Sequence, residues 1–265
     1  MSETTITWAQ VAASALLVAV AVAVSARQQL GVPRDLLLAA GRAAVQLVAV
    51  GAVLLVLFQS AGGAGALGWI AFMILVAGQV AGHRGRDVHR SRSVATSSIA
   101  LGSCVPLTLL LALGILPVEP RVIVPVGGMI VAGAMQATGL TLLRLAEDVR
   151  SARPAIDARL SLGMPVYHAF RPHRRSAART AMLPAIDSTK VVGLISLPGA
   201  MTGLILAGVD PLTAIRYQIV VMYMLLAATT VSATLASALA QRTLFDNTAH
   251  RLRHTATLHS RQKAL

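Results

Sequence analysis

LPAIDSTKVVGLISLPGAMTGLILAGVDP, residues 183–211, is long and apolar enough to cross a bilayer, yet it contains features that disfavour a helix in lipid. Asp187 and Lys190 lie three residues apart, so a helix places them on one face, where they pair or line a wet interior. Pro198, followed by Gly199, removes a backbone donor and clashes with the preceding turn. Such a break needs cover from protein or water, and transporters use broken helices to bind substrates near the membrane midplane.

The composition indicates an integral membrane protein. Of the 265 residues, 55% are hydrophobic and 12% are charged, and the mean hydropathy of +0.71 exceeds that of soluble domains. The net charge of +13 does not indicate nucleic acid as a partner, because aromatic residues amount to 3% and basic residues cluster between apolar stretches. The single cysteine, Cys104, lies in an apolar run, where we expect a small core residue and no disulfide.

Seven segments are predicted to be transmembrane helices, which makes the expected fold an all-α, polytopic helix bundle. Only helices and closed barrels satisfy the backbone in lipid, and these segments are too long for barrel strands. The first segment follows a polar leader with no basic region or small-residue cleavage site, so we interpret it as a retained span. The predicted spans are residues 8–26, 36–58, 65–82, 94–116, 122–143, 183–207 and 212–240.

Arginines alternate between the loops that connect these segments. They are concentrated after the first, third and fifth spans and in the tail, whereas the other loops carry almost none. The positive-inside rule then predicts the N-terminus outside and the C-terminus in the cytoplasm. Residues 1–245 form one membrane domain in this interpretation, and residues 246–265 form a basic tail in which His250, His254 and His259 are solvated rather than metal ligands.

The long cytoplasmic connection, residues 144–182, is basic but interrupted by apolar residues at partly helical spacing. Its segment IDARLSLGMPVYHAF, residues 156–170, predicts a short helix, a turn at residues 163–165 and a second short helix on the membrane face. The apolar residues indicate that this loop docks against a partner. The alternative is a basic arm that contacts anionic lipid.

Polar side chains inside the predicted spans are candidates for a substrate path, because burying them in a membrane is costly. Arg42 and Gln46 lie four residues apart on one helix face, while Gln79 and Gln136 are isolated in the third and fifth spans. Structural pairing is the alternative for the charged groups. The candidate path consists of Asp187, Lys190, Arg42, Gln46, Gln136, Pro198 and Gly199.

Small residues and methionines carry two weaker signals. The G-x-x-x-G motifs at residues 78–82 and 199–203 are typical of closely packed membrane helices. Methionine thioethers suit a soft metal, although methionine in a helix interface is more often packing, and the metal ligands stay unassigned. The methionines concerned are Met129, Met135, Met201, Met222 and Met224.

Four blocks of the chain resemble the FetB-type ABC transporter permeases: residues 41–54 (GRAAVQLVAVGAVL), 128–145 (GMIVAGAMQATGLTLLRL), 156–165 (IDARLSLGMP) and 183–226. That family includes bacterial permeases assigned to iron export and plant permeases tied to aluminium tolerance. The resemblance implies a multi-pass permease of the bacterial inner membrane that forms a homodimer and pairs with a separately encoded ATP-binding subunit. ATP and Mg would be bound by that subunit, with no cofactor in this chain.

Residues 156–163 also resemble the cytoplasmic coupling motif of ABC permeases, an acid–alanine pair followed by Leu-Gly. The resemblance implies that the coupling residues are Asp157, Ala158, Leu162, Gly163 and Phe170. Asp157 stands where the motif usually has glutamate, and the spacing from Gly163 to residues 183–184 is longer than in classical importers.

The chain contains no G-x-x-x-x-G-K-[ST] loop and no hydrolase signature, so we expect a transport subunit that is not an enzyme and has no catalytic residues. The expected function is export of an iron-like metal ion or a metal-linked solute, driven by ATP hydrolysed in a separate subunit. One alternative is a secondary transporter or channel in which Asp187 and Lys190 handle protons. Others are a non-transporting membrane adaptor and, for the substrate, a nucleotide sugar.

Overall fold

The computed structural model describes residues 7–29, 31–60, 62–246 and 251–252, and within these ranges it is almost entirely helical. Six of the described helices are long and apolar enough to cross a membrane, which confirms the predicted all-α, polytopic bundle. They are α1 (Trp8–Arg27), α2 (Pro33–Ser60), α3 (Gly62–Arg84), α4 (Ser91–Ala112), α5 (Pro120–Ser151) and α9 (Pro211–Leu244).

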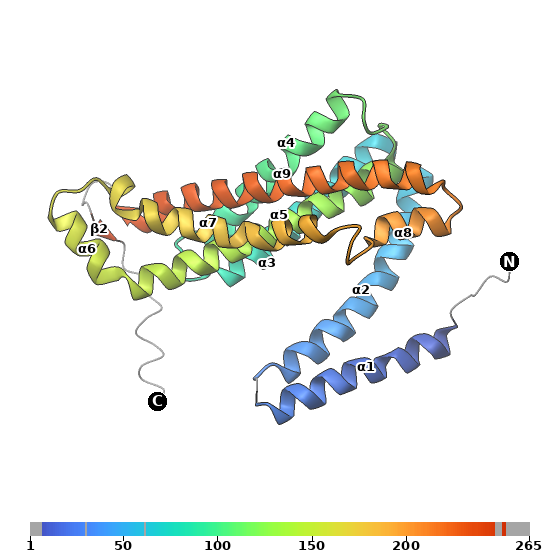
Figure 1. Cartoon of the computed structure of the whole chain (residues 1–265), viewed down its shortest axis with the longest axis horizontal. Helices are drawn as coiled ribbons and strands as arrows, with labels where there is room; N and C mark the ends of the chain where they lie inside the picture. The colour runs from blue at the N-terminus through green and yellow to red at the C-terminus, as the bar shows by residue number, and fades with distance from the viewer. Residues whose placement is uncertain (1–6, 30, 61, 247–250, 253–265) are drawn as a thin grey trace. The chain divides into compact units, whose positions relative to one another are not determined.

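The N-terminal unit, residues 1–62, contains α1 and α2, which pack against each other as a helical hairpin (Figure 1). α1 begins with a capping box, in which Gln10 N–H donates to Thr7 Oγ1 and Thr7 N–H donates to Gln10 Oε1. Nearly all described side chains of the hairpin are exposed, and most of them are apolar. Such a surface requires lipid or another protein surface around it.

The second unit, residues 63–265, is built around α5 and α9, which pack along each other and against α4 (Figure 1). The buried side of α9 is formed largely by alanines, because small side chains let helix backbones approach closely. Larger side chains from α4 and α5, including Ile99, Ile130 and Leu142, fill the remaining space.

The first G-x-x-x-G motif packs α3 against α4. A Cβ placed on Gly82 would lie 2.6 Å from the Cα of Arg92, and one on Gly78 would lie 2.9 Å from the Cα of Thr96. At Gly199 and Gly203, by contrast, a Cβ would meet no atom within 4 Å. The structure therefore gives the motif at residues 78–82 the close-packing role, and shows none for the motif at residues 199–203 within the described second unit.

Gly82→Ala should separate α3 from α4, because the added methyl group meets backbone atoms that cannot rotate away. Overpacking of this kind costs about 1–3 kcal/mol. We expect a lower melting temperature and a lower yield of the purified protein in detergent. The matched control is Gly203→Ala, which adds the same methyl group in open space and should be neutral or slightly stabilising.

The predicted sixth span, residues 183–207, is not one continuous helix. Its first part belongs to α7 (Val166–Val191), an irregular stretch follows at residues 192–198, and α8 (Gly199–Leu206) carries the rest. The break begins before Pro198, since Gly193 has a φ of +82° and its N–H donates to the Ser196 carbonyl over 3.0 Å. Pro198 instead caps the N-terminus of α8, a place where its fixed φ is tolerated.

The interrupted helix accompanies α9 along its length. Both α7 and α8 pack against α9, and Figure 1 shows them running beside it in the opposite direction. The α7–α8 segment thus packs beside α9, a candidate span, although it is not itself among the described helices that are long and apolar enough to cross a membrane.

The predicted loop at residues 144–182 is almost wholly helical. α5 continues to Ser151, and α6 (Arg153–Ser161) follows as the predicted short helix, ending in a turn where Gly163 has a φ of +81°. The prediction of a second short helix is wrong, because α7 starts at Val166 and extends through 26 residues. Buried Ala169, Phe170, Ala177 and Ala181 give this basic stretch a continuous apolar face.

At the described chain end, Phe245 and Leu252 are buried, and β1 (Phe245–Asp246) pairs antiparallel with β2 (Arg251–Leu252). The prediction of a solvated tail falls largely outside the described residues, as do His250, His254 and His259. The prediction that Cys104 is a core residue is wrong: its side chain is exposed, because the buried face of α4 passes through its neighbours Gly102 and Ser103.

Candidate functional site

Asp187 and Lys190 form the ion pair that their spacing predicts. Lys190 Nζ lies 3.2 Å from Asp187 Oδ1 in the last turns of α7, and the two side chains are 67% and 63% exposed. The pair therefore lies on an open face of the second unit, close to the point where α7 ends.

The candidates on α2 and those on α5 and α7 belong to different units of the structure. Arg42 and Gln46 are exposed on α2 in the N-terminal unit. Gln136, Asp187 and Lys190 belong to the second unit. Gln79 is exposed on α3 and lines neither of the two cavities described below.

Gln136 lines the α5–α7–α9 cavity, a space of about 470 Å³ between these three helices. Ser188 and Thr189 of α7 face it from the turn that also carries Asp187 and Lys190. Its wall consists of Met129, Ala132, Gly133, Gln136, Pro184, Ala185, Ser188, Thr189, Met222, Leu225 and Thr229. Gln136 thus lines a cavity beside the turn that carries Asp187 and Lys190, and its role on a substrate path stays a prediction.

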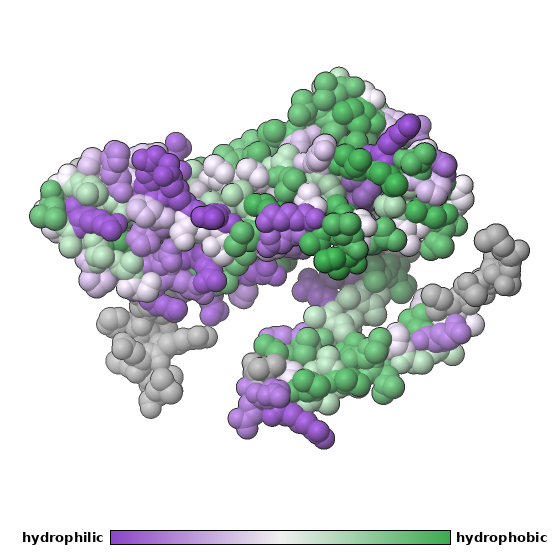
Figure 2. Space-filling view, viewed as in Figure 1, coloured by the Kyte–Doolittle hydropathy of each residue, from purple (hydrophilic) through white to green (hydrophobic). Residues whose placement is uncertain are grey.

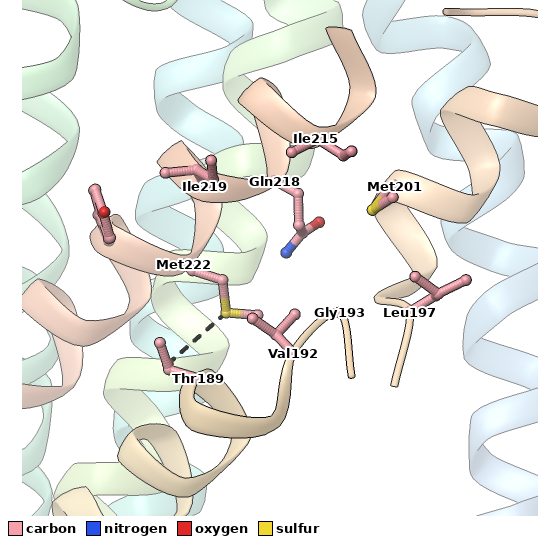
Figure 3. A pocket seen from close by; sticks show the side chains of 10 residues that line it. Thr189, Val192, Gly193, Leu197, Met201, Ile215, Gln218, Ile219 and Met222 are labelled. Carbon is pink, nitrogen blue, oxygen red and sulfur yellow. Dashed lines mark hydrogen bonds between the residues drawn. The ribbon is translucent and has the colours of Figure 1, made fainter. Parts of the chain in front are cut away.

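A second space, the α7–α8–α9 cavity, has a volume of about 550 Å³ and is bounded by the interrupted helix (Figure 3). Pro198 and Gly199 lie between two of its lining residues, Leu197 and Met201, and hold the turn into α8. Its wall consists of Thr189, Val192, Gly193, Leu197, Met201, Ile215, Gln218, Ile219, Met222 and Tyr223.

Thr189 and Met222 belong to both cavities. The Thr189 hydroxyl donates a weak hydrogen bond to the Met222 sulfur over 3.9 Å, drawn as the dashed line in Figure 3. Of the methionines named from the sequence, Met129, Met201 and Met222 thus line cavities, whereas Met224 is buried in the helix core.

Gln218 of α9 is the site residue that sequence reasoning missed. Its side chain is buried, and within the described part of the chain Oε1 has no hydrogen-bond partner. Gln136 was chosen because it is a glutamine inside a predicted span, and the same criterion would have identified Gln218 from the sequence.

The coupling candidates surround the turn between α6 and α7. Leu162 is 87% exposed, and Ala158 and Gly163 are also exposed. Asp157 is partly exposed, with Oδ2 3.6 Å from Arg153 Nε. Phe170 is fully buried against Phe245, with ring centroids 5.1 Å apart, and its coupling role stays a prediction.

Several contacts brace this turn on the helix bundle. Ile156 of α6 is fully buried, and Arg159 Nη1 donates to the Ala169 carbonyl over 3.3 Å. On α7, His173 Nδ1 lies 3.4 Å from Asp148 Oδ2 of α5, and Arg174 donates to Gln241 Oε1 of α9 over 2.9 Å. Through these contacts, the turn and the start of α7 are connected to both α5 and α9.

Among the residues that the structure describes, no group of three or more histidine, cysteine, aspartate or glutamate side chains is placed to bind a metal ion. The polar groups that line the two cavities are amides, hydroxyls and thioethers.

Comparison with known proteins connects these features to a family. Residues 8–245 match the family described as "Uncharacterised protein family (UPF0014)". The "UPF0014 membrane protein STAR2" of Oryza sativa subsp. japonica is 45% identical over 85% of this chain and 79% of its own length. The "Protein ALUMINUM SENSITIVE 3" of Arabidopsis thaliana is 39% identical over 83% of this chain and 81% of its own.

A bacterial relative covers more of the chain. The "Probable iron export permease protein FetB" of Escherichia coli (strain K12) is 36% identical over 95% of this chain and 97% of its own length. No solved structure matches the chain.

Proposed function

The chain belongs to the UPF0014 family of membrane proteins, and from this premise we propose that it is the membrane-spanning subunit of an ATP-driven exporter of a metal ion or metal-linked solute. The observation that carries the proposal is the exposed turn around Leu162 and Gly163, which leads into α7, a helix that contacts α5 through His173 and α9 through Arg174. A large aliphatic side chain exposed on a braced element is typical of a docking contact.

ATP would be hydrolysed outside this chain. The sequence has no phosphate-binding loop, so the energy must arrive through contact with a separate subunit that binds ATP and Mg. α6 and its turn are suited to receive it, because displacement of this element would move α7 and with it the wall of both cavities. We also propose that two copies of the chain form the membrane part of the transporter.

The export of a metal is supported by the relative named as an iron export permease, which matches along nearly the whole of both chains. The name of the Arabidopsis relative refers to aluminium sensitivity. We propose a metal ion or metal-linked solute as the cargo of this chain. We propose a bacterial inner membrane as the location of the chain.

We propose the orientation that the arginine pattern predicts, with the C-terminus in the cytoplasm. Figure 2 shows hydrophilic side chains gathered over α6 and the adjoining part of α7, and hydrophobic ones over α4. The basic residues at this end include Arg150, Arg171 and Arg175. An arginine-rich end of a bundle is expected on the cytoplasmic side.

A reporter enzyme that works only in the cytoplasm should be active when fused after Arg159 in α6 and inactive when fused after Asp210, which caps α9. The difference arises because the interrupted α7–α8 segment crosses the membrane between these two positions. Enzyme activity normalised to fusion-protein level is the measurement. Equal activity at both positions would show that the segment does not cross.

The proposed function is tested by metal accumulation in a bacterial strain that lacks its own exporter. Expression of this chain together with its ATP-binding subunit should lower cellular iron measured by mass spectrometry, and expression of either subunit alone should not. A decrease with this chain alone would favour the secondary-transporter alternative.

A further inference from the structure

We propose that the α7–α8–α9 cavity binds an uncharged organic molecule, or a metal ion enclosed in organic ligands as an uncharged complex, and that Gln218 orients it. This inference rests on the proposed function, because it names the chemical class of the cargo. Of the residues that sequence analysis placed on the substrate path, Pro198 and Gly199 adjoin this cavity, and none is part of its wall.

The first observation is the position of Gln218. Figure 3 shows its amide directed into the space between Met201, Met222 and Gly193. The residue is 6% exposed, and its Oε1 is buried with no partner among the described residues. A buried amide oxygen is destabilising unless a donor reaches it, so a bound molecule that offers an N–H or O–H group would satisfy it.

The second observation is the charge of the wall. The residues that line the cavity carry no carboxylate, imidazole, ammonium or guanidinium group, and their polar atoms are an amide, two hydroxyls and two thioethers. A bare multivalent cation would lose its hydration here without an opposite charge to replace it. Hard cations also prefer carboxylate and carbonyl ligands to thioethers. An uncharged molecule meets neither penalty.

The third observation is size. The volume of about 550 Å³ falls within the range of roughly 300–1,000 Å³ typical of small-molecule sites. An octahedral hydrated cation, with about 30 Å³ for each water, would fill only about 180 Å³. The cavity therefore fits an organic molecule or a metal with a complete organic shell better than an aquated ion.

The wall of the cavity also contains the chain break. Val192, Gly193 and Leu197 come from the irregular stretch between α7 and α8, whose backbone is not held by a helical ladder along its length. Discontinuous helices line the substrate sites of many transporters for this reason. On the opposite side, the Thr189–Met222 contact separates this cavity from the α5–α7–α9 cavity, and rotation of the flexible Met222 side chain would join the two.

The test measures binding to the purified complex of this chain with its ATP-binding subunit in lipid nanodiscs. The probe is tris(kojato)iron(III), an uncharged complex whose hydroxymethyl groups keep O–H donors from which Gln218 Oε1 can accept a hydrogen bond, and bound iron is measured by equilibrium dialysis and mass spectrometry. We expect saturable binding that Gln218→Leu weakens by about tenfold, since the substitution keeps the bulk of the side chain and removes the hydrogen bond. Gln79→Leu is the matched control on the exposed face of α3 and should bind as the unmodified protein does.

A second variant tests the cavity even if Gln218→Leu does not fold. Ile219→Trp keeps Gln218 and narrows the cavity from its exposed edge, so it should also weaken binding of the iron complex. One further probe, kojic acid without iron, separates the sources of the chemistry. Gln218-dependent binding of kojic acid by itself would identify the organic molecule as the recognised part, whereas binding of the iron complex but not of kojic acid would identify the enclosed metal.

Two results would overturn the inference: unchanged binding of the neutral complex in both Gln218→Leu and Ile219→Trp, or Gln218-dependent binding of charged ferric citrate with no binding of the neutral complex. The proposed function is judged separately. If iron export still requires ATP and both subunits, that function stands while this site fails. If export does not require them, the proposed function itself fails.

Discussion

Leu162→Asp should abolish ATP-driven export while the helix bundle stays folded and inserted. The Leu162 side chain is 87% exposed in the described structure, so its replacement changes the free energy of unfolding by no more than about 0.5 kcal/mol. At a docking contact, however, a carboxylate would have to be desolvated without a partner. Export from proteoliposomes should fall to the level measured without the ATP-binding subunit. That subunit should also no longer co-purify with this chain.

The matched control for this variant is Val118→Asp. Val118 is also an exposed aliphatic residue, but it lies in the connection between α4 and α5, at the other end of the proposed topology. Gly163→Pro gives a second view of the same turn, because a φ of +81° is inaccessible to proline and the direction of α6 must change. Normal export by both Leu162→Asp and Gly163→Pro would favour a lipid contact over a docking contact.

The double variant Asp187→Asn/Lys190→Met should reach the membrane, keep its melting temperature and lose export. Both side chains are about two-thirds exposed, and an exposed i,i+3 ion pair contributes no more than about 0.5 kcal/mol. The pair is thus too exposed to stabilise the bundle appreciably. The pair adjoins Ser188, which lines the α5–α7–α9 cavity, and Thr189, which lines both cavities. We propose that the two charges help a solute to enter or leave these cavities.

The control is the double variant Arg144→Met/Glu147→Gln. This pair has the same i,i+3 spacing, with Arg144 Nη1 3.0 Å from Glu147 Oε2, and it is also partly exposed. It lies on α5 and lines neither cavity. We expect this variant to export normally. Full export by the Asp187/Lys190 variant at normal expression would leave that pair with a structural role alone.

The spans that hydropathy predicted correctly are those in which an apolar stretch continues without interruption, such as α1 and α9. The α7–α8 segment differs because its helix ends at a glycine with positive φ, a backbone property that a hydropathy average does not register. The proline drew attention to the right region but not to the right residue, since Pro198 begins a helix here.

The error at the coupling turn has a different cause. The sequence predicted only a second short helix after the turn, although buried Ala177 and Ala181 at helical spacing continue α7 through the arginines of residues 171–179. The burial of Phe170 could not be predicted from its own segment. Its burial depends on Phe245, which is far away in the sequence and reaches it through the end of α9. Local patterns do not contain such contacts.

The cavities could be predicted only in part. Gln136 and the methionines were recognisable as polar or polarisable groups within spans, but which of them share a cavity depends on how α5, α7, α8 and α9 cross. The helix break that forms one wall also depends on this packing.

The central claim is that this chain moves its cargo only when a separate subunit hydrolyses ATP. The most direct measurement is iron transport in proteoliposomes that contain this chain with or without its ATP-binding subunit. We predict transport that requires both subunits and hydrolysable ATP, and that stops when the phosphate-binding lysine of the ATP-binding subunit is replaced. Transport by this chain alone, driven by a proton gradient without ATP, would contradict the account.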